Sequence, residues 1–552
     1  MSADWLIRNA RVIDGTGTQA FEADVVVDAG TITQILRRPG DAPAARRTVD
    51  AEGRVLSPGF IDMHAHSDIQ ILAGPDHTAK VSQGVTLEVL GQDGLSFAPI
   101  DEPTRAALLI QIAGWNGAPE DFAYDWNTVA AYLDRLDRGI ACNAAYLVPQ
   151  GTLRFMIVGP DDRPASPAQL EAMIALLTQG LREGAVGMSS GLTYPPGMFT
   201  DNEELASLCR VVGEHGGYYS PHHRSYGVGA LEAYAEMIGM CRSARCPLHL
   251  THAVMNFEPN RGRAGALLQL IDRATAAGAD ITLDSYPYLP GSTTLSALLP
   301  SWASAGGPEA LLKRLRDPAQ RAVIGYELEH VGTDGCHGCT ADWRTIQISG
   351  VLNTALSDRV GSTVAELAQA INREPRDVFF QLLIEDQLGT TILQHVGHEE
   401  NVQTIMRHQT HCGGSDSILV GERPHPRAWG TFPRYLSRYV RELGVLDLVD
   451  CIHHLTGRPA ARLKLYQRGL VRQGYAADLV LFDPHTVQDT ATYDQPRNAA
   501  RGIDWVWVNG VPVIERTHRT PAQPGRAMRR TSHGTRPHPP QKAQHSARPT
   551  MP

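Results

Sequence analysis

Two histidines in the segment Pro58–Asp68 are spaced so that both could bind one metal ion. The segment reads Pro-Gly-Phe-Ile-Asp-Met-His-Ala-His-Ser-Asp, and His64 and His66 stand two positions apart. Residues i and i+2 of a β-strand point to the same side, so both imidazoles would face one point. Imidazole nitrogen is a preferred ligand of zinc and similar ions. A pair of surface histidines is the competing interpretation, but the apolar run Phe60–Met63 is typical of a buried strand.

Other acidic and imidazole side chains stand at the ends of further predicted strands. They are Asp93, His252, Asp416 and one of the adjacent pair His222 and His223. In a closed β/α barrel, the carboxyl ends of all strands meet at one rim, where barrel enzymes carry out their chemistry. We therefore expect these side chains to converge on the same centre as the first two histidines.

Several long motifs resemble a known family. The segment Pro58–His66 resembles the first-strand signature of the amidohydrolase superfamily, whose members are metal-dependent hydrolases built on a β/α barrel. Further motifs resemble one branch, the D-aminoacylases or N-acyl-D-amino-acid deacylases: Gly187–Gly197, Leu250–His252, Tyr286–Ser292, Gly414–Asp416 and His425–Arg434. The resemblance extends from about Asp4 to about Glu515, in the order of the family.

The resemblance implies a set of metal ligands. The family pattern His-x-Arg matches His222-His-Arg224 and therefore selects His222 rather than His223. It implies one or two divalent ions, with zinc as the expected metal, held by His64, His66, Asp93, His222 and His252.

Asp93 is where this sequence departs from the resemblance. The better-known D-aminoacylases carry a zinc-binding cysteine in a Gly-Asn-Cys-Gly motif, whereas Gly91–Gly94 reads Gly-Gln-Asp-Gly. Carboxylate oxygen is harder than thiolate, so it accepts zinc but also manganese or iron. Its two oxygens could bridge two ions. A turn-capping role is the competing interpretation of this aspartate.

Asp416 is the candidate catalytic residue. In the superfamily, the aspartate that ends the last strand takes a proton from metal-bound water, and Asp416 in Cys412–Ser417 matches that position. A metal ion lowers the pKa of its water to about 7, and a nearby carboxylate can pass the proton on to the leaving amine. A helix N-cap is the competing interpretation.

The resemblance also implies a substrate site with three hydroxyl groups, those of Tyr194, Tyr286 and Ser292. Hydroxyls can hold a carboxylate or an amide oxygen. Family members often carry a lysine two residues after the strand-six histidine, but Val254 stands there. Arg224 and Arg427 remain as candidate clamps for a substrate carboxylate, or as structural ion-pair residues.

Length and patterning predict more than one domain. A barrel needs about 250 residues and grows by insertion, and the chain has 552. We expect a (β/α)8 TIM-like barrel at 58–468 with an insertion near its mouth at about 294–386. A small β-sandwich domain is expected from both termini, 1–57 and 469–518, followed by a disordered basic tail at 519–552, which is rich in Pro, Arg and His. The barrel strands are expected at Phe60–Met63, Val85–Leu90, Ala141–Val148, Ala185–Ser189, Tyr218–Ser220, Pro247–Thr251, Ile281–Ser285, Thr391–Val396 and Thr410–Gly414.

Composition bounds the partners. The net charge of −9 argues against nucleic-acid binding. The sequence contains no apolar run of about 18 residues, so no membrane span is expected. A cytoplasmic protein acting on a small molecule is the expectation, while the oligomeric state stays open.

The leading hypothesis is metal-dependent hydrolysis of the amide bond of an N-acyl-D-amino acid or a close relative. The same chemistry on a cyclic amide, as in hydantoinases and dihydropyrimidinases, or on a lactone or another acylated compound, is the alternative. A non-catalytic binding protein is a third interpretation, supported only by the Cys-to-Asp exchange. The sequence leaves D versus L preference, acyl group and side-chain specificity open.

Overall fold

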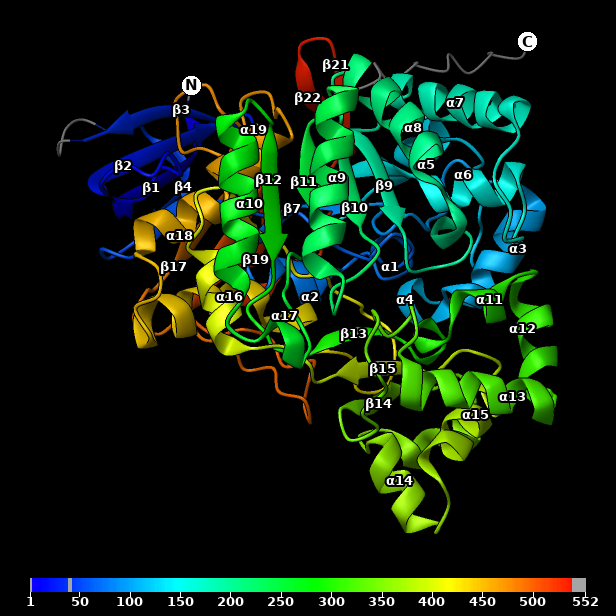
Figure 1. The fold of residues 1–552 in the computed structure, drawn as a ribbon. Coiled ribbons are helices and arrows are strands. Elements are labelled where there is room, and N and C mark those ends of the chain that lie inside the picture. The colour runs from blue at the N-terminus through cyan, green and yellow to red at the C-terminus, as the bar shows by residue number, and fades with distance from the viewer. Residues whose placement is uncertain (1, 38–41, 539–552) are drawn as a thin grey trace, which may run out of the picture.

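The computed structural model describes residues 2–37 and 42–538, and a parallel barrel of eight strands stands at its centre (Figure 1). Each strand pairs with the next in parallel. They are β6 (Phe60–Asp62), β7 (Val85–Leu90), β8 (Asn143–Pro149), β9 (Gly187–Gly191), β10 (Tyr218–His222), β11 (Leu248–Leu250), β12 (Ile281–Ser285) and β16 (His411–Gly413). Every residue of β7 and β8 is buried, as expected for parallel strands covered on both faces.

The first and last barrel strands meet at a seam. The backbone N–H of Asp416 donates to the carbonyl of His64 at 2.8 Å, and the N–H of His66 donates to the carbonyl of Ser417 at 3.0 Å. The seam therefore places the two first-strand histidines directly beside the aspartate that follows the last strand.

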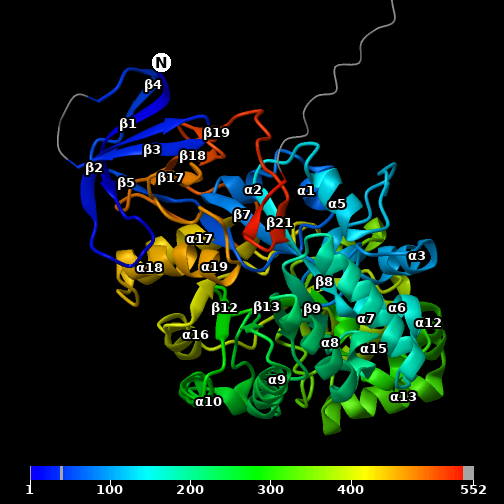
Figure 2. The same cartoon turned by 90° about the horizontal axis from the view of Figure 1, so that it is seen from above.

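Helices form the outer layer of the barrel (Figures 1 and 2). The larger ones are α5 (Val129–Leu136), α7 (Pro167–Arg182), α8 (Asn202–Glu214), α9 (Ala230–Ala244), α10 (Ala264–Ala276), α16 (Glu399–Met406) and α18 (Leu448–Leu455). The others here are α1 (Gln70–Ala73), α2 (Thr78–Val81), α3 (Glu102–Gln111), α4 (Ala113–Asn116), α6 (Gln150–Ile157), η1 (Gly197–Phe199), η2 (Glu258–Asn260), α17 (Arg427–Arg434), η6 (Tyr435–Glu442) and α19 (Gly457–Arg462). Ser166 and Gln169 form a capping box at the start of α7. Across 2–37 and 42–538, no helix has the length and apolarity needed to cross a bilayer.

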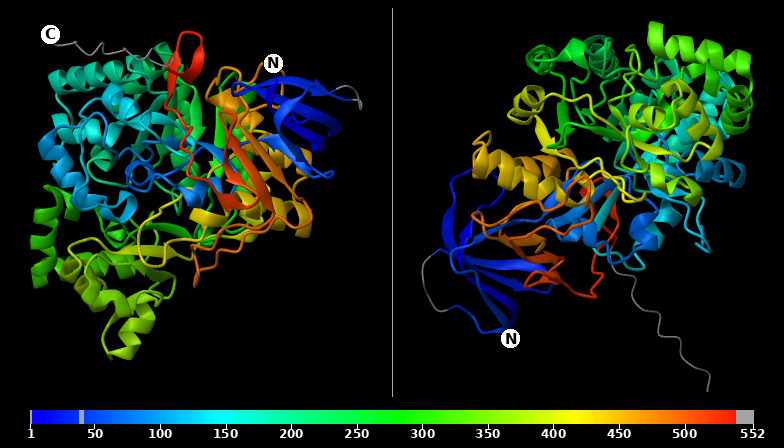
Figure 3. Two further views of the ribbon diagram at one scale, coloured as in Figure 1. Left: turned by 180° about the vertical axis from the view of Figure 1, so that it is seen from behind. Right: turned by 90° about the horizontal axis from the view of Figure 1, so that it is seen from below.

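Both termini contribute to one β domain beside the barrel (Figure 3). The N-terminal strands are β1 (Ala3–Val12), β2 (Phe21–Asp28), β3 (Thr31–Leu36), β4 (Ala45–Asp50) and β5 (Val55–Pro58). The C-terminal strands are β17 (Leu479–Phe482), β18 (Ile503–Val508), β19 (Val511–Glu515) and β20 (His518–Arg519). They form one nine-stranded sheet in which β5 pairs antiparallel with β17. Trp5, Trp505 and Trp507 pack together in its core.

The insertion lies at the carboxyl ends of the barrel strands (Figure 1). It carries β13 (Gly291–Thr294), β14 (Ile346–Gly350) and β15 (Thr391–Gln394), which form a separate sheet in the order β13-β15-β14. Its helices are η3 (Leu295–Leu298), α11 (Ser301–Ser304), α12 (Gly307–Arg316), α13 (Pro318–Tyr326), η4 (Glu327–Val331), η5 (Thr354–Arg359), α14 (Val364–Ala370) and α15 (Pro375–Glu385). The prediction that Thr391–Val396 is a barrel strand is wrong, because this apolar segment pairs within the insertion.

The expectation of a disordered tail from residue 519 is wrong over 519–538. This segment forms the hairpin β21 (Met528–Thr531) and β22 (Gly534–Pro537). Met528 is fully buried, and Arg529 pairs with Asp134 at 2.6 Å and with Asp137 at 2.5 Å. Arg529 of this basic segment is thus paired with acidic residues on and just after α5. Residues 539–552 lie outside the described part of the chain.

Candidate metal centre and active site

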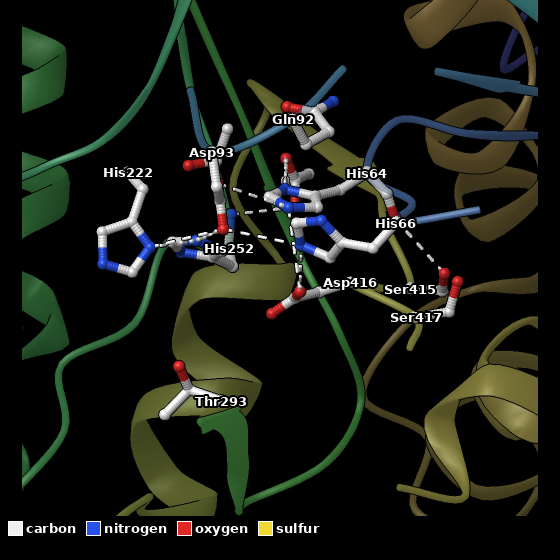
Figure 4. A network of polar contacts seen from close by, with 12 residues as sticks. His64, His66, Gln92, Asp93, His222, His252, Thr293, Ser415, Asp416 and Ser417 are labelled. Atoms are coloured by element: carbon white, nitrogen blue, oxygen red, sulfur yellow. Dashed lines mark hydrogen bonds and ion pairs between the residues drawn. The ribbon is translucent and has the colours of Figure 1, made fainter. Parts of the chain in front are cut away.

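The carboxyl ends of the barrel strands bring the predicted ligands together in two overlapping groups (Figure 4). Within each group, all ligand atoms lie within 4.8 Å of one another. One group contains His64, His66, Asp93 and Asp416, and the other contains Asp93, His222 and His252. Asp93 is common to both, so its carboxylate stands where a ligand shared by two ions would stand.

The two oxygens of Asp93 face different imidazoles. Oδ1 lies 3.5 Å from Nε2 of His64, while Oδ2 lies 3.4 Å from Nδ1 of His222 and 3.6 Å from Nε2 of His252. Burial raises the pKa of Asp93, but the imidazoles of His64, His252 and His222 lower it by more. The net pKa of Asp93 is therefore well below the usual range. The carboxylate is therefore ionised and able to bind a cation.

Three of these residues have a left-handed backbone. The φ angles are 53° at Asp93, 30° at His252 and 47° at Asp416. Such values are uncommon for residues other than glycine and cluster at functional sites, where surrounding structure holds them. Each follows directly or closely after a strand, so the chain turns sharply and projects the side chain into the barrel mouth.

Neighbouring polar groups orient the histidines. The Thr193 hydroxyl lies 2.8 Å from Nε2 of His222, which leaves Nδ1 facing Asp93. Asp284, at the end of β12, accepts the backbone N–H of His252 at 2.9 Å and lies 3.8 Å from Nδ1 of His64. Such partners fix the orientation of metal-binding imidazoles. Asp284 was missed by the sequence analysis, although its place at a strand end was the available signal.

His249 also belongs to this outer layer. Its Nε2 lies 3.0 Å from Asp284 Oδ2, and its Nδ1 lies 2.7 Å from the Thr282 hydroxyl. It is fully buried. It therefore helps to hold Asp284, rather than serving only to pack the strand.

The donor set suits a divalent cation. Both ring nitrogens of His64, Nδ1 of His66 and Oδ1 of Asp93 are buried without a hydrogen-bond partner among the described residues. Buried polar atoms are nearly always satisfied, and imidazole nitrogens with carboxylate oxygens are ligands that zinc accepts. The arrangement fits one or two such ions.

Asp416 connects this centre to Arg427. Its Oδ1 lies 3.3 Å from Nε2 of His66, while its Oδ2 lies 3.0 Å from Nη1 of Arg427. Burial raises the pKa of Asp416, but the charges of Arg427 and His64 outweigh burial and lower it. The carboxylate is thus held in its basic form at the edge of the cluster.

The other predicted substrate residues are placed unequally. The Tyr194 ring lies 4.7 Å from that of His222, and Arg427 stacks 4.5 Å above the ring of Tyr286. Ser292 lies on β13, opposite Leu393, in the insertion sheet. Tyr194 and, through Arg427, Tyr286 therefore lie beside the cluster, whereas Ser292 is placed in the insertion sheet.

Arg224 is not brought into the cluster. Its Nε lies 3.2 Å from Glu236, and its Nη2 donates to the carbonyl of Thr200 at 2.6 Å. Of the two predicted clamps, the structure favours Arg427 at the site and gives Arg224 an ion pair elsewhere.

The sequence analysis also did not identify a buried lysine beneath the rim. Lys80, on α2, donates to Asp62 at 2.6 Å, to the Ser415 hydroxyl at 2.9 Å and to the Ser417 hydroxyl. Its side chain is fully buried, and the two serines flank Asp416. The ammonium therefore joins the first strand to the turn that carries the candidate base.

Comparisons with known proteins agree with this geometry. The sequence profile of the amidohydrolase family matches residues 47–514. A D-aminoacylase of Alcaligenes xylosoxydans xylosoxydans is 34% identical over 532 residues, covering 96% of this chain and 98% of its own. An N-acyl-D-aspartate deacylase of the same organism is 33% identical, covering 95% of each chain.

One solved structure is also similar over nearly the whole chain. It is the N-acyl-D-glutamate deacylase of Bordetella bronchiseptica, complexed with zinc and a phosphonate inhibitor that mimics the tetrahedral intermediate of the reaction. Its TM-score is 0.82 at 31% identity, with 96% of this chain and 100% of the other covered.

Proposed function

This chain belongs to the amidohydrolase family, and from that we propose that it hydrolyses the amide bond of N-acyl-D-amino acids with the help of bound divalent metal. The observation that carries the proposal is the pair of ligand groups that share Asp93 at the barrel mouth. Relatives that are D-aminoacylase and N-acyl-D-aspartate deacylase cover nearly the whole chain and support this substrate class.

We assign the ligands by their grouping. Asp93, His222 and His252 would hold one ion, and Asp93 with His64 and His66 would hold a second. Zinc is the expected metal, because nitrogen and carboxylate donors suit it. A bound divalent ion supplies Lewis acidity, which polarises the scissile carbonyl and acidifies water.

Asp416 would act as the general base and then as the general acid. One of its oxygens faces the ligand cluster and the other is held by Arg427. In this position the carboxylate can accept a proton from the attacking water and deliver it to the leaving amine nitrogen. The lowered pKa keeps it ionised before the reaction begins.

Arg427 would also bind the substrate carboxylate. It is fully buried, and its Nε and Nη2 have no hydrogen-bond partner within the described residues. A guanidinium with free N–H groups suits a carboxylate. Tyr286 lies against its face and supports its orientation.

A substrate panel tests the proposal. Purified protein is assayed on N-acetyl-D-amino acids, N-acetyl-L-amino acids and cyclic amides, first as isolated, then after chelation, and finally after zinc is restored. We expect hydrolysis of the D series, its loss on chelation and its recovery with zinc. Activity confined to cyclic amides, or unchanged in metal-free protein, would overturn the proposal.

A further inference from the structure

A cavity lies beside the metal centre, between the barrel rim and the insertion. Leu95, Ile112 and Trp115 line it from the loop and short helices after β7, and Ala297 and Leu311 line it from the insertion. Figure 1 shows α4 close to α11 and β13. The cavity volume is about 50 Å³, which is room for roughly three or four water-sized groups.

Two aromatic side chains that line this cavity, Trp115 and Tyr194, also lie against histidines of the metal centre. The Trp115 ring lies 5.5 Å from the ring of His66 and 4.6 Å from that of Tyr194. The Tyr194 ring in turn lies 4.7 Å from that of His222, and its hydroxyl lies 3.2 Å from that of Thr293. A substrate whose amide lies at the metal centre would therefore have a neighbouring group within reach of the cavity.

The lining is mostly apolar and carries no charge, although Gln111, Thr294, Ser296 and Ser304 contribute polar side chains. Among the described residues that line the cavity, none is Asp, Glu, Lys, Arg or His. An ionised carboxylate that enters such a space loses its hydration without gaining a cationic partner. An aliphatic group gains from the same transfer. The cavity thus favours an apolar group over an acidic one.

One residue of the cavity lining carries a buried polar atom without a partner in the described part of the chain. Trp115 is 3% exposed, and its Nε1 has no hydrogen-bond partner within the described residues. Leaving buried polar atoms unpaired is costly, and a polar atom of a bound substrate would relieve that cost.

We propose that this cavity receives an uncharged aliphatic group of roughly three or four carbons from the substrate. This inference rests on the proposed function and specifies its substrate class: N-acyl-D-amino acids whose acyl group or side chain is short and apolar, with D-aspartate and D-glutamate side chains disfavoured. It separates this chain from the similar proteins that are N-acyl-D-aspartate and N-acyl-D-glutamate deacylases.

Two substrate series identify which group enters the cavity. The first varies the side chain of N-acetyl-D-amino acids, from alanine through 2-aminobutyrate, valine and leucine to phenylalanine, with aspartate and glutamate added. The second varies the acyl group on D-alanine, from formyl to octanoyl. In the series that reports on the cavity, kcat/KM should rise about fourfold per added methylene until the cavity is full, and then fall.

Two variants change the cavity in opposite directions. Ala297→Leu fills it and should move the optimum of the responding series to shorter groups, with about a tenfold loss for the longest good substrate. Leu311→Ala enlarges it and should move the optimum to longer groups. Leu312→Ala is the matched control, because Leu312 neighbours Leu311 on α12 and is similarly buried but does not line the cavity.

The outcomes are distinct. Opposite shifts in one series, absent from the control, support the inference, and the responding series names the group. Unchanged preferences in both folded variants, or wild-type preference for D-aspartate or D-glutamate, overturn it while the proposed function stands. If a variant fails to fold, the wild-type preference for short apolar or for acidic groups decides. A wild-type enzyme that is inactive on every N-acyl-D-amino acid would instead contradict the proposed function.

Discussion

Asp416 stands at the meeting point of the ligand cluster and Arg427, and its carboxylate is proposed to move the proton in the reaction. Asp416→Asn keeps the size and one hydrogen-bond acceptor but removes the base. We expect kcat to fall by about 10²- to 10⁴-fold, while metal content changes little because the other ligands remain. Stopped assays on N-acetyl-D-amino acids and elemental analysis of the same preparation measure the two quantities. Near-normal turnover would refute the assigned role.

Asp93 is the ligand that we propose sets which metals the centre accepts. Asp93→Cys replaces hard oxygen with soft sulfur, so we expect the ratio of bound zinc to bound manganese to rise by about tenfold or more. Elemental analysis after dialysis against equal concentrations of both ions measures this ratio. Asp93→Ala is the companion variant and should lose metal from both groups of ligands, because they share this carboxylate. An unchanged ratio in the cysteine variant would show that Asp93 does not bind the metal.

At the scale of elements, the seam between the first and last barrel strands is held by a buried charge. Lys80 binds Asp62 and the two serines on either side of Asp416, and it lies 3.5 Å from Glu88. Burial lowers the pKa of Lys80, but the charges of Asp62 and Glu88 outweigh burial and raise it. The lysine therefore remains a cation and stabilises the unusual backbone at the candidate base.

Removing this cation should affect both stability and rate. Lys80→Met leaves Asp62 buried and unpaired, and the free energy of unfolding should fall by about 3–5 kcal/mol. We also expect kcat to fall while metal content is retained, because the turn that carries Asp416 loses two hydrogen bonds. Chemical unfolding and kinetics measure the two effects.

Two further variants make this test specific. Lys313→Met replaces an exposed lysine on α12 and should change stability by no more than about 0.5 kcal/mol. Adding Asp62→Asn to Lys80→Met should restore part of the lost stability, since no carboxylate is then left unpaired. A Lys80→Met protein as stable and as active as the wild type would contradict the role of the lysine at the seam.

The sequence predicted the elements where local pattern decides them. The apolar runs at Val85–Leu90 and Ile281–Ser285 are β7 and β12 with the same bounds. Ligands at strand ends could be predicted for the same reason, because all such ends meet at one rim. The grouping around Asp93 follows from this rule and not from any local motif.

The parts of the fold that the sequence did not predict depend on contacts between distant segments. Thr391–Val396 has the composition of a barrel strand, but pairing with β13 and β14 takes it into the insertion. The basic segment after residue 519 was predicted to be disordered, yet Arg529 forms ion pairs with Asp134 and Asp137, almost 400 positions earlier in the chain. No local signal reports such pairings.

At the scale of the whole molecule, buried neutral histidines make stability depend on pH. His411 is fully buried on β16, where its Nδ1 faces His454 at 3.1 Å and its Nε2 lies 3.0 Å from the Ser285 hydroxyl. Burial, assisted by the charge of Arg458, lowers the pKa of His411 to about 3. In the unfolded chain a histidine titrates near 6.5.

The sign of the effect follows from where the proton binds. Between pH 6.5 and about 3, the unfolded chain takes up a proton that folded His411 refuses, so acid favours unfolding. This histidine alone should cost about 2 kcal/mol of stability at pH 5 relative to pH 7.5. His411→Gln cannot titrate, so its free energy of unfolding, although lower at neutral pH, should fall less steeply with acid than that of the wild type.

Urea unfolding at pH 7.5, 6.5 and 5.5 measures these slopes. Comparing the variant with the wild type cancels the pH dependence of the groups that do not interact with His411. His485→Gln is the control, because His485 is exposed on the β domain and its loss should leave the slope unchanged. If His411→Gln loses stability with acid as steeply as the wild type, folded His411 takes up its proton over the same pH range as the unfolded chain. The polar contacts with Ser285 and His454 would then have to accommodate a charge, which their close packing beneath the last barrel strand argues against.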